Sequence, residues 1–207
     1  MAVRELMQAE VPADRIHGLV AADDGRLLWT HRSVTAGAPM LGQPAPAYAN
    51  GLVVVGFGSG QISALRADSG TIAWSDSLGA SRLRSALTDY TAIRGLPAIY
   101  GGIVYVIGMG GLVAAIDLPT GRRVWERQIA GEDTPCVAGD WVFLISVEQE
   151  AIALNRRDGR IAWVTPLPRW GDIEKKREPI TWYGPVLAGD RLVATGTTEE
   201  ALALSPY

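Results

Sequence analysis

Short apolar runs alternate along this chain with turns that are rich in glycine and aspartate. Residues 103–107, Ile-Val-Tyr-Val-Ile, are a continuous β-branched and aromatic run that follows the turn Tyr-Gly-Gly at 100–102. Such a run is typical of a strand that is buried on both faces. Two further runs, at 112–116 and 122–127, follow it after glycine-containing turns. Together with a short strand at 97–99, they predict an antiparallel meander of four strands.

The same meander recurs before and after this segment. Each copy has an apolar second strand and a third strand joined by short turns, and most copies add an outer strand. The chain lacks helical periodicity, and its strands are regularly spaced. The possible architectures are therefore a sandwich, a barrel or a propeller. The further strands are predicted at 52–55, 61–65, 71–75, 141–146, 151–154, 160–165, 191–195 and 201–204.

A fixed spacing relates the copies to one another. In each full copy a glycine follows the opening proline by 24 positions, and a tryptophan follows it by 28. Gly25 and Trp29 end an earlier copy, and Pro185 opens a last one whose glycine would fall at position 209. The three full copies are Pro46, Gly70, Trp74; Pro97, Gly121, Trp125; and Pro135, Gly159, Trp163.

Repeats of this length select one architecture. A unit of about 45 residues with four strands and two apolar faces is typical of a propeller, in which each blade packs against its neighbours. We therefore predict an all-β fold, a partial β-propeller of four-stranded antiparallel blades. The propeller is expected at 18–207, after a segment, 1–17, that does not fit the repeat. Full blades are predicted at about 44–77, 95–129 and 133–167, with an incomplete first blade and an incomplete last blade at 183–207.

The repeated tryptophan and glycine predict how the blades are held together. An indole buries roughly 150–250 Å² and its N–H needs a partner, so a tryptophan on each outer strand can wedge against the neighbouring blade. The glycine four residues earlier supplies the positive φ of the preceding turn. We favour this structural role over a ligand-stacking platform, because identical positions in successive blades face neighbours rather than one shared site. The predicted docking residues are Gly25, Trp29, Gly70, Trp74, Gly121, Trp125, Gly159 and Trp163.

Composition narrows the possible functions. The net charge is -3, and the scattered Lys and Arg residues give no basic face, so we expect no nucleic-acid partner. There is no apolar stretch of about 20 residues to span a membrane. The N-terminus carries neither a secretory leader nor a lipid-attachment cysteine, so expression as written predicts a cytoplasmic protein.

Candidate chemical motifs have simpler structural readings. The glycine-rich segment 56–60 follows a strand and leads into another strand, which predicts a hairpin turn rather than a phosphate-binding loop. His17 and His31 are expected in solvated loops and support neither a metal cluster nor a catalytic triad. Cys136 is expected to be a small buried apolar residue beside a strand. The aspartates just before the blade turns, Asp68, Asp117 and Asp158, are expected to cap those turns.

Residues 64–74 and 115–125 resemble the tryptophan-docking repeat of quinoprotein-like propellers, which have eight blades. Two branches share this repeat: pyrroloquinoline-quinone dehydrogenases and the BamB (YfgL) family of the outer-membrane β-barrel assembly machinery. Longer stretches, at 134–144, 163–170 and 184–192, are similar to the second half of the BamB family. This resemblance implies about four blades of an eight-bladed type.

The BamB resemblance implies a non-catalytic scaffold that docks the periplasmic domains of the barrel subunit through inter-blade loops. It also implies a location at the periplasmic face of the outer membrane and no cofactor. The quinone enzymes use an adjacent-cysteine disulfide, which the single Cys136 cannot form. Trp and Arg are enriched at binding hot spots, so we also count the two tryptophans of the 163–185 connection among the predicted partner-binding residues. The predicted partner-binding residues are Met40, Leu41, Asp89, Arg94, Trp170 and Trp182.

Two other functional classes stay open. One is a fragment of a quinone-dependent dehydrogenase, and the other is an orphan propeller that serves as a protein-interaction platform. If the half-propeller is the whole product, its open strand edges predict self-association.

Overall fold

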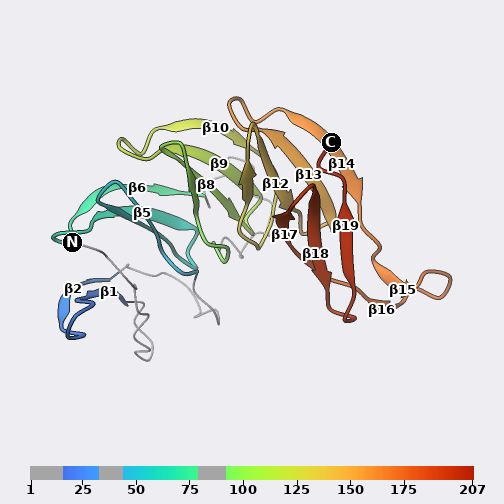
Figure 1. The fold of residues 1–207 in the computed structure, drawn as a ribbon, viewed down its shortest axis with the longest axis horizontal. Helices are drawn as coiled ribbons and strands as arrows, with labels where there is room; N and C mark the ends of the chain where they lie inside the picture. Colours follow the sequence, from blue (N-terminus) through green and yellow to red (C-terminus); the bar gives the residue numbers. More distant parts are fainter. Residues whose placement is uncertain (1–15, 33–43, 79–91) are drawn as a thin grey trace.

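The computed structural model describes residues 16–32, 44–78 and 92–207. These residues form an all-β fold without a helix, in which antiparallel sheets follow one another along an arc in chain order (Figure 1). We number the sheets of the arc as blades 1 to 5. Blade 1 contains β1 (Ile16–Val20) and β2 (Leu27–Arg32), and blade 2 contains β3 (Ala47–Ala49), β4 (Leu52–Gly56), β5 (Gln61–Arg66) and β6 (Ile72–Ser77).

The remaining blades continue the same order. Blades 3 and 4 are four-stranded, blade 5 has three described strands, and a two-stranded ribbon lies between blades 4 and 5 in the sequence. Blade 3 contains β7 (Ala98–Tyr100), β8 (Ile103–Gly108), β9 (Leu112–Asp117) and β10 (Arg123–Arg127). Blade 4 contains β11 (Cys136–Ala138), β12 (Trp141–Ile145), β13 (Glu150–Asn155) and β14 (Ile161–Pro166). The ribbon is β15 (Trp170–Asp172) and β16 (Arg177–Pro179), and blade 5 contains β17 (Trp182–Ala188), β18 (Arg191–Gly196) and β19 (Ala201–Leu204).

The meanders predicted from sequence are confirmed, with three differences of extent. Strand β1 begins at Ile16, inside the segment predicted to lie before the propeller. Strand β17 begins at Trp182, three residues before the expected opening proline. The connection between blades 4 and 5 also contains the β15–β16 ribbon, which the repeat spacing did not reveal because the ribbon belongs to no repeat.

The middle strands are continuously apolar because each blade is covered on both sides. Val54 and Ile62 of blade 2 pack with Val104 and Ala114 of blade 3 in one buried cluster. The opposite side of blade 3 contributes Tyr105 to a second cluster, shared with blade 4. A strand between two such clusters has no solvent face, which explains the absence of alternation in its sequence.

Each outer-strand tryptophan reaches across to the following blade. The Trp74 indole N–H donates a 2.7 Å hydrogen bond to the Leu118 carbonyl of blade 3. Its ring lies on Gly121, where an added Cβ would stand 2.6 Å from the indole. The repeat glycine therefore serves twice: it adopts a φ of 72° in its own turn and leaves room for the neighbour's tryptophan. The same bond links Trp29 to Ala67 (2.9 Å), Trp125 to Arg156 (2.8 Å) and Trp163 to Pro206 (3.3 Å).

Gly25 shares the conformation of the other docking glycines without their neighbour. Its φ is 70°, the same as that of Gly70, and its N–H donates to the Ala21 carbonyl as that of Gly70 does to Arg66. Within the described part of the chain, no atom lies within 4 Å of a Cβ built at Gly25. The Gly25 turn of blade 1 therefore has the same conformation as the turns that accept a tryptophan, but none of the described tryptophans packs on it.

Candidate partner-binding site

The connections between blades lie against hairpin turns at one end of the strands. Each connection runs from an outer strand to the inner strand of the next blade. The Ile93 N–H donates to the Phe57 carbonyl (3.1 Å), and the Met109 N–H donates to the Ala92 carbonyl (3.0 Å). Phe57 lies in the turn over residues 56–60, which is the hairpin turn predicted from sequence. These bonds fix the connections on the turns.

A small polar cluster joins two successive connections to the first strand of blade 5. Arg94 pairs with Glu132 at 2.9 Å, and the Leu96 N–H donates to the Thr134 hydroxyl at 2.8 Å. The Asp133 carboxylate accepts a 2.9 Å hydrogen bond from the Gly184 N–H, which lies within β17. We call Arg94, Glu132, Asp133 and Gly184 the connector cluster.

Gly95 is required for the close approach of two of these connections. A Cβ at this position would collide with the backbone of Asp133. Residues 95, 133 and 184 all lie one or two positions before an opening proline, at Pro97, Pro135 and Pro185. That offset from the repeat could have identified the cluster in the sequence, although the nature of the contacts could not be foreseen.

The connector cluster is charged and partly open to solvent. The Arg94 side chain is 43% exposed, and the Glu132 side chain is nearly as accessible. Burial raises the pKa of Asp133, although the hydrogen bond from Gly184 and the nearby Arg94 charge act in the opposite direction. An exposed ion pair beside a half-buried carboxylate can offer charged hydrogen-bonding groups to a partner protein.

The raised pKa of Asp133 predicts a pH dependence of stability. A carboxyl group that binds its proton more tightly when folded adds stability as the pH falls through its folded-state pKa, and loses that contribution as the pH rises. We expect the unfolding free energy of the native chain, relative to an Asp133→Asn variant, to increase from neutral pH towards the ordinary aspartate pKa of 3.8. Chemical denaturation of both proteins across this range measures the difference. If this difference in stability instead decreased towards low pH, the Gly184 hydrogen bond and the Arg94 charge would lower the Asp133 pKa by more than burial raises it.

The two predicted tryptophans occupy different environments. Trp182 is 3% exposed, its indole N–H donates to the Pro168 carbonyl at 2.6 Å, and its ring belongs to a core cluster. The prediction that it contacts a partner is therefore wrong for this conformation, because neighbouring side chains already enclose the ring. Trp170 is half-buried in β15, where it pairs with Pro179. Arg94 and Trp170 keep accessible surface, whereas Met40, Leu41 and Asp89 lie outside the described residues.

The residues considered for other chemistry have structural positions. His17 and His31 lie opposite each other in β1 and β2, so the prediction of solvated loops is wrong. The His31 ring lies 6.4 Å from that of Phe57, and burial lowers its pKa. Asp117 caps its turn as expected, accepting a 3.1 Å hydrogen bond from the Thr120 N–H. Cys136 lies within β11 rather than beside a strand, and burial raises its pKa.

The described residues contain no group of three or more His, Cys, Asp or Glu side chains placed to hold a metal ion. They also include no helix that is long and apolar enough to cross a membrane.

The model of one protein family, described as outer membrane protein assembly factor BamB, matches residues 4–165. The chain belongs to the BamB family. The match includes most of segment 1–17, for which the repeat spacing gave no account. Curated BamB proteins are similar to it: that of Yersinia pestis is 27% identical over 140 residues, which are 68% of this chain and 36% of the relative. That of Moranella endobia is 28% identical over 143 residues, which are 68% and 36% of the two chains. The chain thus spans about a third of the length of these relatives.

Solved structures agree on the fold. The crystal structure of BamB from Moraxella catarrhalis aligns with a TM-score of 0.78 at 19% identity, covering 92% of this chain and 55% of that one. A quinohemoprotein alcohol dehydrogenase from Comamonas testosteroni aligns with a TM-score of 0.65 at 15% identity, covering 92% of this chain and 38% of that one. At these identities the likeness establishes the β-propeller fold alone, in agreement with the fold predicted from sequence.

Proposed function

We propose that this BamB-family chain is a non-catalytic scaffold of the outer-membrane β-barrel assembly machinery. In this proposal it acts at the periplasmic face of the outer membrane, where its inter-blade connections bind the periplasmic domains of the barrel subunit. Membership of the BamB family carries the proposal. The connector cluster supports it, because a charged, partly exposed surface held by backbone hydrogen bonds suits protein recognition better than bond-making chemistry.

We further propose that the partner surface includes the loop that carries Asp89. Asp89 precedes Arg94 in the connection between blades 2 and 3, so it would add a negative charge to the proposed surface. Trp170 is proposed to contribute accessible aromatic area, since Trp and Arg are enriched among residues that dominate binding energies.

The proposal is tested by mixing the purified chain with the periplasmic domains of a barrel subunit and titrating the complex. We expect saturable binding that Asp89→Ala weakens by about tenfold, which corresponds to ~1.4 kcal/mol. The melting temperature should stay unchanged, because a surface-loop substitution usually alters stability by less than about 0.5 kcal/mol. Asp68→Ala, in a blade turn at the opposite end of the strands, is the matched control and should bind normally. Absence of binding, or parallel loss of binding and folding, would contradict the proposal.

A quinone-dependent dehydrogenase is the second candidate, favoured by the structural likeness to the quinohemoprotein alcohol dehydrogenase. At 15% identity that likeness concerns the fold alone. An absorbance titration with pyrroloquinoline quinone and calcium separates the candidates: a saturable quinone complex would favour the enzyme over the scaffold.

A further inference from the structure

Residues 132–134, which we call the clamp segment, bond to the connection that precedes blade 3. Glu132 pairs at 2.9 Å with Arg94, whose side chain is exposed. The Thr134 hydroxyl accepts a 2.8 Å hydrogen bond from the Leu96 N–H. Because both of these partners belong to the connection between blades 2 and 3, the clamp segment holds that connection against its own.

The middle residue of the clamp segment, Asp133, bonds in the opposite direction. Its carboxylate accepts a 2.9 Å hydrogen bond from the Gly184 N–H in the first strand of blade 5. Gly184 lies where the pairing of β17 with β18 is irregular, between Tyr183 and Val186. A segment of three residues thus joins the parts of the chain that enter blades 3, 4 and 5.

Gly95 brings the two connections into backbone contact beside the clamp bonds. It is buried, and a Cβ built on it would collide with the Asp133 carbonyl group and stand 2.6 Å from the Thr134 nitrogen. Its φ is not positive, so space rather than backbone conformation requires a glycine at this position. Arg94 is the preceding residue, and its exposed side chain is therefore held by a buried contact of the neighbouring backbone.

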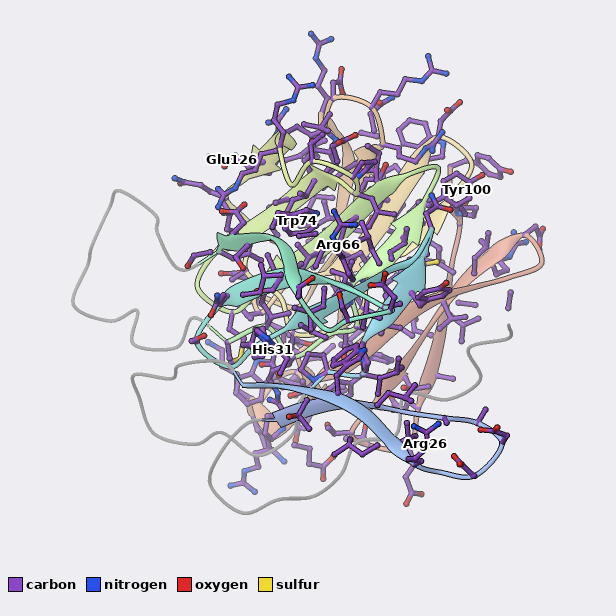
Figure 2. The ribbon with its side chains drawn as sticks, turned by 90° about the vertical axis from the view of Figure 1, so that its left-hand side faces the viewer. Arg26, His31, Arg66, Trp74, Tyr100 and Glu126 are labelled. Carbon is purple, nitrogen blue, oxygen red and sulfur yellow. The ribbon has the colours of Figure 1, made fainter. Side chains whose placement is uncertain are left out.

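The clamp segment lies at the strand ends that the docking tryptophans do not join. Trp74 packs against blade 3 and bonds to the Leu118 carbonyl, which follows β9 (Figure 2). The connection into blade 3 instead bonds to Met109, which precedes β9. Tryptophan docking therefore fastens one end of the blades, and the clamp segment supplies contacts between blades at the other end.

We propose that Asp133 and Thr134 are positioning residues, which hold the exposed Arg94–Glu132 pair in place before the barrel subunit binds. This inference rests on the function proposed above. A surface that is already ordered loses less conformational freedom on association, so its affinity is higher than that of the same groups on mobile connections. Asp133 and Thr134 would thus act through Arg94 and Glu132 rather than by touching the partner.

Titration of the full chain with the periplasmic domains of a barrel subunit tests this role. Asp133→Ala and Thr134→Val each remove one hydrogen-bond acceptor, and each should weaken binding about fivefold or more. Asp133→Asn and Thr134→Ser keep an oxygen that can accept the same bond, so they should recover most of the lost affinity. A direct contact of the Asp133 charge with the partner would instead leave Asp133→Asn as weak as Asp133→Ala.

Gly95→Ala tests the same role through a group that does not face the partner. The added methyl group would be buried against Asp133, so it should displace the connection that carries Arg94 and weaken binding about fivefold or more. Gly18→Ala, in blade 1, is the matched control. Its φ is not positive either, and the nearest atom to its Cβ position is 3.4 Å away, so this variant should bind as the native chain does.

Binding is measured at a temperature at which circular dichroism shows each variant to be folded, so that unfolding does not account for weaker binding. If Gly95→Ala does not fold, the paired substitutions at Asp133 and Thr134 still decide the question. Native affinity of Asp133→Ala or Thr134→Val, or failure of Asp133→Asn to recover binding, would overturn this inference alone. Absence of binding by the native chain would overturn the proposed function and this inference with it.

Discussion

Trp125→Ala should lower the free energy of unfolding by about 3–5 kcal/mol, the range for removal of a large buried aromatic side chain. The ring is 7% exposed and packs on Gly159 of the next blade, and its centroid lies 6.0 Å from that of Tyr105. The substitution also leaves the Arg156 carbonyl without its 2.8 Å hydrogen bond. Loss of the packing on Gly159 and of the hydrogen bond to Arg156, both at the junction of blades 3 and 4, explains the size of the expected effect.

Denaturant unfolding of the native and variant chains measures this change. Trp170→Ala is the matched control, because Trp170 is half-buried in the short β15–β16 ribbon rather than between blades. Trp170→Ala should lower the free energy of unfolding by clearly less than Trp125→Ala does. Equal unfolding curves for the native chain and Trp125→Ala would contradict the role of the tryptophan in joining blades 3 and 4.

Gly121→Ala should destabilise the chain through two separate effects. At a φ of 72° an L side chain is strained, which costs about 1–2 kcal/mol. Its Cβ would also stand 2.6 Å from the Trp74 ring, and such overpacking typically costs about 1–3 kcal/mol. The indole has little room to move, because its N–H is bonded to the Leu118 carbonyl.

Gly102→Ala separates these two effects. Gly102 has a similar φ of 77°, but none of the atoms in the described segments lies within 4 Å of its Cβ position. The control therefore carries the backbone cost without the collision, and Gly121→Ala should be the less stable variant by thermal or chemical unfolding. If both substitutions cost the same, Trp74 does not rest on Gly121 as the structure shows.

Local sequence patterns predicted the strands well, because they depend on neighbouring residues. The run at 103–107 appears as β8 and the turn over residues 56–60 joins β4 to β5, as expected. Long-range contacts were beyond those patterns. Trp182 looked like an interface residue beside a charged segment, yet three chain segments enclose it: Gln149 and Pro168 bond it, and Ala194 shares its cluster.

The candidate binding site was predictable in part. The family resemblance implied that the inter-blade loops bind the partner, and the Arg94 side chain is 43% exposed. Its partner Glu132 comes from the next connection, 38 residues away. The offset from the opening prolines could have located this cluster, but not the contacts within it.

The sequence by itself determined the repeat, the strand order, the turn glycines and the tryptophan that each outer strand carries. These features follow from local conformational preference and from periodic burial, both of which are encoded within a single copy of the repeat. The tertiary structure alone decided that Gly70, Gly121 and Gly159 each accept the indole of the preceding blade, and that Asp133 bonds to Gly184 of blade 5. The physical reason is distance along the chain: these contacts form between blades, and their geometry depends on how one sheet packs on the next.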